Sequence, residues 1–587
     1  MDGRWNLDVL YRGFDDPRFK EDFARLDSLA DEFRALAADE SVKDLELVHA
    51  FLNMSEEFAL LGGRIGVYSG LRYEADTNDV EAQGVSGRLM AKQSEIAAAD
   101  ASLRRRVAAV DPELIKSDGS LDAYADLLDR LRKDCAHLLS PGEEEVFARM
   151  NISGAGAWEE LRSALTSSAT AEYRGQTLTL TQLRQLADDP DESVRRDACA
   201  AEIEACRSVE KPVAFALNSI KLQVINECAM RGFASPLEKT LYDSRMKRET
   251  LDAMLSAMAE YMPVFHRYLR AKAKLLGYEG GLRWYDLFAP VGKSGRKFSV
   301  DEAKEYLLGI FGEVNTGIRD LIKRAFENEW IDFFAREGKV GGAFDCGLPG
   351  LSESRVLTNF RGTTGDVVTL AHELGHAFHD LQVSGYTELL RGYTMPVAET
   401  ASTFNENVVM SRAIADAEDD ETKLGLIESQ LCDACQIICD IYSRYLFETE
   451  VFERRAEEFL DPDTLCEIMT GAQKKAYGDG LDESTLNPYM WLSKSHYYIG
   501  SLSFYNFPYA FGGLLARGLY AKYLREGGAF FDAYKKMLRM TPVLDVEDAA
   551  AVAGIDLTDR AFWEEGLKSF AEEIGEFEKI AARTEKK

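Results

Sequence analysis

Residues 366–380, DVVTLAHELGHAFHD, contain the most informative pattern of the chain, the pentad HELGH at positions 372–376. On an α-helix four residues advance the chain by about 400°, so the imidazoles of His372 and His376 project from one face, one turn apart. This separation suits two ligands of one tetrahedral zinc ion, while Glu373 is placed to take a proton from the water that the ion binds. The pentad therefore predicts a zinc site of the hydrolase type, carried by a helix.

The residues before the pentad predict a capped helix start. Residues 361–366, RGTTGD, are typical of a turn, and Thr364 or Asp366 can cap the helix that follows. Its two glycines also occur in anion-binding loops, but no lysine follows in phosphate-loop spacing. A plain turn is the better interpretation.

A catalytic zinc usually keeps three protein ligands and one open position, so one further ligand must come from elsewhere in the chain. The metzincin pattern would place glycine and histidine where this chain has His379 and Gln382. A carboxylate from a later helix remains, and the nearby candidates are Glu388, Glu399 and Glu406. We predict Glu399, which lies 23 residues after the second histidine of the pentad, behind a glycine- and proline-containing loop, where a new helix begins.

Two neighbouring residues are predicted to support the ligands. Glu406 lies seven residues beyond Glu399, hence on the same helical face, where it can hydrogen-bond a ligating imidazole. His379 would have to reach back almost a full turn further than His376 to bind the same ion. We therefore expect His379 to support the site or to pack beside it.

A second unusual stretch runs from Tyr489 to Phe511 and holds ten ring-bearing side chains. Peptide hydrolysis needs hydrogen-bond donors for the negative charge that develops on the carbonyl oxygen, and one such donor contributes about 3–4 kcal/mol. For each tyrosine, a core ring with a satisfied hydroxyl is the alternative. The predicted donors are His496, Tyr498, Tyr505 and Tyr509.

These motifs resemble the oligoendopeptidase F group of zinc metallopeptidases, which are relatives of thimet oligopeptidase. The resemblance is carried by residues 359–362, 366–380, 398–402 with 405–406, and 496–512. Weaker similarities reach both ends, from WNLD at 5–8 to GIDL at 554–557. The resemblance therefore covers essentially the whole chain.

The resemblance implies a mainly α fold, a two-lobed helical ellipsoid with a deep central channel and a small β-sheet beside the zinc helix. It implies one Zn²⁺ per chain, held by His372, His376 and Glu399, with Glu373 as general base. His496 and a tyrosine of the following segment would stabilise the oxyanion. Members of this family often have FYxYxY where this chain has FYNFPY at 504–509, so Tyr505 and Tyr509 both stay candidates.

The segment GGAFDC, residues 341–346, is similar to the edge strand of that family and has the pattern of a strand by itself. Its small residues would let a peptide backbone approach and add as an extra strand. Gly342, Ala343 and Phe344 are therefore predicted to contact substrate. A hairpin without a ligand is the alternative.

Length and composition predict two interlocked lobes. The 587 residues are 46% apolar, enough for a large core, and no Ser/Gly/Pro-rich linker divides them. We predict a helical N-terminal lobe over 1–190 and a catalytic lobe over 191–587. The boundary is the acidic cluster at 188–191, which follows an alternating strand at 177–181.

The net charge of −31, from 100 acidic and 69 basic residues, disfavours nucleic acid and anionic membranes as partners and favours cationic peptides. No apolar stretch of 18 residues and no signal peptide is recognisable. The odd number of cysteines, nine, fits a reducing compartment. We expect a cytoplasmic protein.

The predicted function is a zinc-dependent endopeptidase that hydrolyses internal bonds of short peptides. One alternative is a zinc carboxypeptidase that trims peptide ends, which would need a closed channel and a basic group for the terminal carboxylate. A peptide-binding scaffold with an inactive zinc site is a further alternative. It is less favoured, because Glu373 and the other residues that such a scaffold would lose are all present.

Overall fold

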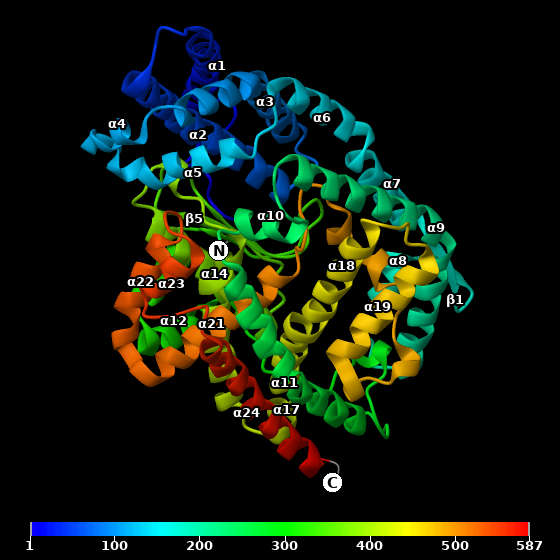
Figure 1. Cartoon of the computed structure of the whole chain (residues 1–587). Coiled ribbons are helices and arrows are strands. Elements are labelled where there is room, and N and C mark those ends of the chain that lie inside the picture. Colours follow the sequence, from blue (N-terminus) through cyan, green and yellow to red (C-terminus); the bar gives the residue numbers. More distant parts are fainter. Residues whose placement is uncertain (1–2, 585–587) are drawn as a thin grey trace.

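Helices form most of the computed structural model, which describes residues 3–584 (Figure 1). In the first third of the chain they are α1 (Pro17–Ala38), α2 (Asp44–Ala75), α3 (Val80–Ala108), α4 (Pro112–Lys116), α5 (Ala125–Ala136), α6 (Pro141–Ser153), α7 (Ala155–Ser168) and α8 (Leu180–Arg184). The middle contains α9 (Glu192–Met230), α10 (Pro236–Asp243), α11 (Arg248–Leu275), α12 (Val300–Val314) and α13 (Thr316–Glu327). The prediction of a mainly α fold is confirmed.

The last part of the chain is also helical and contains the motifs singled out above. Its helices are α14 (Thr364–Val383), α15 (Met395–Ala398), α16 (Thr400–Asp416), α17 (Asp420–Cys435), α18 (Ile441–Arg455), α19 (Pro462–Tyr477), α20 (Met490–Ser493), α21 (Phe507–Glu526), α22 (Phe530–Met540), α23 (Val546–Ala551) and α24 (Arg560–Thr584). Helix α14, which carries the pentad, packs against α16, α22 and strand β4 (Phe344–Gly347).

The N-terminal helices gather at one end of the molecule, at the upper left of Figure 1, and have apolar cores of their own. Helix α1 begins where the Asp16 side chain accepts a hydrogen bond from the Arg18 backbone N–H. Its buried residues Leu26, Leu29 and Phe33 recur at helical spacing, so one face packs on α2 and α3.

A larger core unites the rest of the chain. Its first members along the sequence are Ala155 on α7 and Ala169, and it extends to Ala581 on α24. Apart from Leu348, which packs into one of the N-terminal cores, Leu131 is the last buried residue of those cores. The chain thus passes from the N-terminal cores to the larger core between residues 131 and 155. The domain boundary at 190 and the deep channel remain predictions.

Two small sheets interrupt the helices. Strands β1 (Thr170–Tyr173) and β2 (Gln176–Thr179) form an antiparallel hairpin. The expected strand ends at Thr179 rather than at 181, because the Thr179 side chain caps α8.

The second sheet contains β3 (Ile331–Asp332), β4 and β5 (Ser354–Leu357) in the order β3-β5-β4, so β4 is an edge strand. Both β4 and β5 pack on α14, as expected of a small sheet beside the zinc helix.

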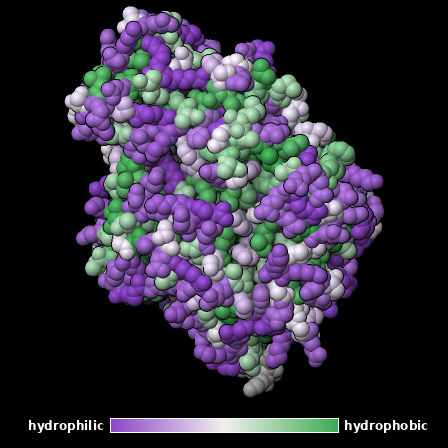
Figure 2. Space-filling model, viewed as in Figure 1, coloured by the Kyte–Doolittle hydropathy of each residue, from purple (hydrophilic) through white to green (hydrophobic). Residues whose placement is uncertain are grey.

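The face seen in Figure 2 is mostly hydrophilic, with apolar residues in small groups. Within residues 3–584, no helix combines the length and the apolar composition that a bilayer crossing requires.

Candidate metal centre

Helix α14 begins with a reciprocal cap. The Thr363 hydroxyl accepts a hydrogen bond from the Asp366 backbone N–H, and the Asp366 carboxylate accepts one from the Thr363 N–H. The predicted caps were Thr364 and Asp366. The capping residue is Thr363, one position earlier, and Asp366 serves as its partner in the first turn.

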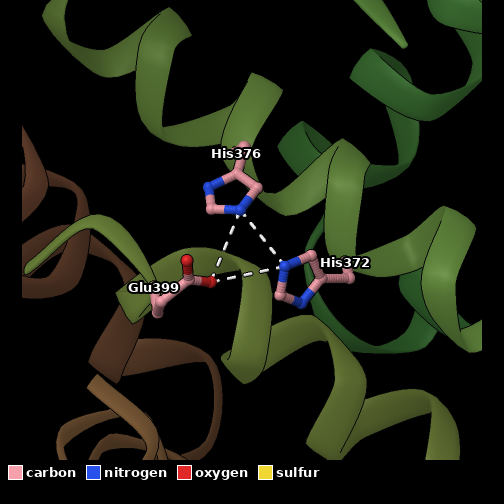
Figure 3. A group of neighbouring side chains, drawn as sticks. All are labelled: His372, His376 and Glu399. Atoms are coloured by element: carbon pink, nitrogen blue, oxygen red, sulfur yellow. Dashed lines mark hydrogen bonds and ion pairs between the residues drawn. The ribbon is translucent and has the colours of Figure 1, made fainter. Parts of the chain in front are cut away.

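Figure 3 shows His372, His376 and Glu399 with their polar atoms turned toward one point. The two Nε2 atoms are 3.2 Å apart, and Glu399 Oε2 lies 3.3 Å from His372 Nε2 and 3.5 Å from His376 Nε2. All three donor atoms lie within 4.8 Å of one another, a grouping that could hold one metal ion. The structure therefore brings together the three residues that the sequence singled out.

A close crossing of α14 and α16 brings Glu399 to the histidines. A Cβ atom on Gly375 would lie 2.5 Å from the Ala401 carbonyl oxygen and from Ser402 Cα, so only glycine permits this approach. The Asn405 side-chain amide donates to the Ala371 carbonyl and ties the two helices together. The sequence analysis missed this role of Gly375, which stands at an unspecified position of the HExxH pattern.

Two hydrogen-bonding groups orient the ligand set. The Ser402 hydroxyl donates to Glu399 Oε2 at 2.9 Å. Glu406 Oε1 lies 2.9 Å from His372 Nδ1, although the Nδ1 atom is not aligned as a hydrogen-bond donor. Glu406 is thus at the place expected of a residue that supports a ligating imidazole.

The charges of the three candidate ligands favour a cation at their meeting point. Burial acts to lower the pKa of His372, but Glu399 and Glu406 outweigh it and raise that pKa to about 10. For Glu399, burial acts to raise the pKa, but contact with His372 outweighs burial and holds that pKa at about 2. Burial and His372 lower the pKa of His376 to about 4, so this imidazole keeps a free lone pair at neutral pH. Two imidazoles and a carboxylate in this arrangement fit a zinc ion.

Glu373 contacts strand β4 and also interacts electrostatically with His372 and Glu399. The residue is 6% exposed, and burial is the main reason that its pKa rises to about 7. The backbone N–H of Asp345 on β4 acts in the opposite direction. This carboxyl group can therefore exchange a proton near neutral pH.

The aromatic segment supplies one group of side chains near the metal cluster. The His496 ring centre lies 4.7 Å from that of Tyr505 and 6.2 Å from that of Tyr509. Tyr509 lines the same cavity as His372 and Glu399. Burial and the neighbouring Tyr505 raise the pKa of Tyr509, so its hydroxyl remains protonated.

Tyr498 has a different environment. Its ring is 1% exposed and lies under the Arg162 guanidinium, and its hydroxyl donates to the Trp491 carbonyl oxygen. This is the satisfied core ring that stood as the alternative for each tyrosine. Tyr498 has no hydroxyl proton left for a substrate.

His379 is fully buried beside the site. Its ring stacks on Tyr393 with centres 4.0 Å apart, and its Nε2 atom lies 2.9 Å from the Thr541 hydroxyl. Burial is the main reason that the pKa of His379 falls to about 3. Its contacts are those of a packing residue.

The expected substrate strand starts later than its sequence pattern. Gly342 and Ala343 precede β4, which begins at Phe344, and Gly342 has a φ angle of 83°. The Asn359 side-chain amide donates to the Gly342 carbonyl and holds this approach to the strand. Strand β4 pairs on one side with β5 and with no other described strand.

A pair of acids that was not predicted lies near Glu373. Asp345 on β4 and Asp380 on α14 interact. Burial has the largest effect on the pKa of Asp345, the charges of Asp380 and Glu373 come next, and together they raise it well above its usual value. The Tyr393 hydroxyl donates to Asp380 at 2.9 Å. The seven-residue spacing of Glu373 and Asp380 on one helical face was the only available signal.

Comparison with known proteins gives one consistent result. A family model described as Peptidase family M3 matches residues 185–569, and one described as Oligopeptidase F matches 112–170. Oligopeptidase PepF of Bacillus subtilis (strain 168) is 24% identical over 531 residues, which cover 88% of this chain and 78% of that protein. Group B oligopeptidase PepB of Streptococcus agalactiae serotype III (strain NEM316) is 23% identical over 605 residues, 99% of this chain and 97% of that protein.

A solved structure is similar in fold. The crystal structure of oligoendopeptidase-F from Enterococcus faecium superposes with a TM-score of 0.71 at 19% identity, covering 96% of this chain and 99% of that one. The resemblance to the oligoendopeptidase F group is thereby confirmed. Since the M3 model alone spans well over half of the chain, the protein belongs to peptidase family M3.

Proposed function

We propose that the protein is a zinc-dependent oligoendopeptidase that hydrolyses internal bonds of short peptides. The observation that carries this proposal is the convergence of His372, His376 and Glu399 within 4.8 Å, next to the buried Glu373, in a chain of family M3. The printed names of both curated relatives, which are oligopeptidases, support short peptides as the substrate class.

His372, His376 and Glu399 would hold one Zn²⁺, which when bound polarises the scissile carbonyl and makes water more acidic. Glu373 accepts a proton from the attacking water and returns it to the amine that leaves. A pKa raised to about 7 suits both steps, since the carboxylate can take the proton and the acid can release it near neutral pH.

Donors from the aromatic segment complete the proposed site. His496 and one of the tyrosines at 505 and 509 would donate hydrogen bonds to the carbonyl oxygen as it gains negative charge. The peptide would lie along the free edge of β4, with Gly342, Ala343 and Phe344 beside it. A deep channel that admits only short peptides is part of the same proposal, as is a place in the cytoplasm, where the nine free cysteines would stay reduced.

The test is cleavage of an internally quenched peptide of about ten residues, blocked at both ends, with a chelator and after zinc is added back. We expect internal cleavage that the chelator abolishes and zinc restores, and no cleavage of folded proteins. Trimming of a free-ended peptide, with the blocked one untouched, would instead establish the carboxypeptidase. No cleavage of either would favour the binding scaffold.

A further inference from the structure

A cavity of about 340 Å³ extends from the metal cluster between helices α14, α16, α17, α21 and α24. His372 and Glu399 form one end of it, and Asp433 on α17 contributes an acidic group to its wall. We call this cavity the α17 pocket. None of the proposed catalytic steps uses Asp433.

Asp433 lacks a partner. Its carboxylate makes no hydrogen bond or ion pair with any residue between 3 and 584. Part of the residue is exposed to solvent, but protein surrounds its carboxyl group. This burial and, to a smaller extent, the charges of Glu406 and Glu428 raise the pKa of Asp433 to about 6. An accessible carboxylate in a concave wall, next to other acids, is well placed to bind a cation from outside the protein.

The neighbouring charges are already engaged. Glu406 contacts His372 at 2.9 Å, and Glu428 forms an ion pair with Lys272 at 2.5 Å. Arg517, which hydrogen-bonds Asn407 in the wall of the pocket, is paired with Glu573 and is 2% exposed. No lysine or arginine is among the described residues that line the pocket, and its charged groups other than His372 are the acids Glu399, Glu406 and Asp433.

Part of the remaining wall is apolar, and Thr403, Asn407 and Tyr509 also line it. Val368 on α14, Met410 on α16 and Phe570 on α24 line the pocket between its acidic groups. Gln430, one turn before Asp433, adds a buried side-chain oxygen that accepts no hydrogen bond in the described part of the chain. Apolar walls with unused acceptors match a long side chain whose stem is aliphatic and whose head donates hydrogen bonds.

We propose that the α17 pocket binds a lysine or arginine side chain of the peptide substrate, and that Asp433 pairs with its cationic head. This inference rests on the proposed peptidase function and adds a preference for a basic residue close to the cleaved bond. Because the other acids are engaged, Asp433 is the residue that discriminates a charged head from a neutral one of the same shape.

The test uses pairs of quenched, acetylated and amidated peptides that differ only by arginine or citrulline at one position around the cleaved bond. At one such position we expect kcat/KM for arginine to exceed that for citrulline at least tenfold, because only the charged head can pair with Asp433. Asp433→Asn should bring this ratio close to one. Asp433→Lys should reverse the preference, so that a glutamate peptide is cleaved faster than its glutamine counterpart.

Glu467→Gln is the matched control, since it removes one carboxylate from the exposed surface of α19. It should preserve both the rates and the arginine preference. A ratio that is near one in the unmodified enzyme, or that survives Asp433→Asn, overturns the assignment. A preference that appears only when the peptide has a free amino terminus also overturns it, because the pocket would then bind the terminal ammonium.

A binding measurement separates this inference from the proposed function. Calorimetric titration of the Glu373→Gln variant with the same peptides should show tighter binding of arginine than of citrulline, and Asp433→Asn in that background should remove the difference. If no peptide is hydrolysed by the unmodified enzyme, the oligopeptidase proposal fails, while the titration still decides whether the pocket selects a basic side chain.

Discussion

Helix α14 meets carboxyl groups on two faces, in opposite ways. On one face, the imidazoles of His372 and His376 lie within 3.5 Å of the Glu399 carboxylate. On the side toward strand β4, Glu373 and Asp380 lie near Asp345, and both raise its pKa. The first face pairs acids with groups that carry or attract positive charge, and the second places acids beside acids.

The difference shows how partners decide the charge of a buried acid. Contact with His372 holds the pKa of Glu399 at about 2, so this carboxylate stays ionised despite its burial. Burial and neighbouring acids raise the pKa of Asp345 well above its usual value, which favours its protonated form. Glu373 has a pKa of about 7, which is what a proton-transfer group needs near neutral pH.

Glu399→Ala should have the largest effect, because it breaks the paired face. Removal of one of three proposed ligands should reduce the zinc content after dialysis to near zero and hydrolysis to background. Metal analysis and peptide cleavage would measure the two effects, with Glu467→Gln as a control of equal charge change. Full zinc occupancy in the alanine variant would place the third ligand elsewhere.

Glu373→Gln should separate the two faces chemically. The amide has nearly the same shape but cannot accept the proton, so kcat should fall by about 10²–10⁴-fold. Zinc content should remain near one per chain, because this side chain is not one of the proposed ligands. Turnover at the unmodified rate would remove Glu373 from the mechanism.

Glu406→Gln should weaken the paired face without breaking it. Loss of the negative charge beside His372 Nδ1 should lower zinc affinity by about 10–100-fold, the usual effect of changing a group that orients a ligand. Competition with a chelator of known affinity measures this change. Unaltered affinity would mean that the contact at 2.9 Å has no part in holding the imidazole.

Asp345→Asn should have the smallest effect, seen in stability. Between the ordinary carboxyl pKa of about 3.9 and the raised pKa of Asp345, the folded chain holds a proton that the unfolded chain has lost, so stability falls as pH rises. The asparagine variant escapes this loss. Its advantage in free energy of unfolding should be near zero at about pH 4 and reach roughly 1–2 kcal/mol above neutral pH.

Urea unfolding of Asp345→Asn at several pH values measures this advantage, and Glu467→Gln again serves as control. A difference that is constant with pH, or that favours the unmodified protein at high pH, would show that Asp345 is not held in its neutral form.

Much of the fold was predictable because its signals are local. The N-terminal lobe was predicted to be helical, as α1 is, and turn residues predicted the start of α14 to within one residue. The exact cap was missed, since Thr363 and Thr364 both offer a hydroxyl and only the backbone conformation selects between them. The end of β2 was missed for the same kind of reason, because Thr179 serves both a strand and a helix cap.

The candidate site was predictable in part. The spacing of His372 and His376 needs only one helix, and the approach of Glu399 follows from a return of the chain. The tyrosines could not be separated by sequence, because Tyr498 and Tyr509 occur in the same aromatic stretch yet one hydroxyl binds the Trp491 carbonyl and the other ring lines the cavity beside His372.

The sequence by itself therefore determined the helical class, the face shared by the two histidines and the kind of chemistry they suit, since these depend on residues within a few turns of one another. Only the tertiary structure decided which faces meet. The close approach at Gly375 joins α14 to α16, the contact of Asp345 with Asp380 joins β4 to α14, and the α17 pocket brings Asp433 near His372. Each of these contacts joins segments tens of residues apart. Packing of whole helices sets those contacts, and periodicity along one segment carries no information about its partner.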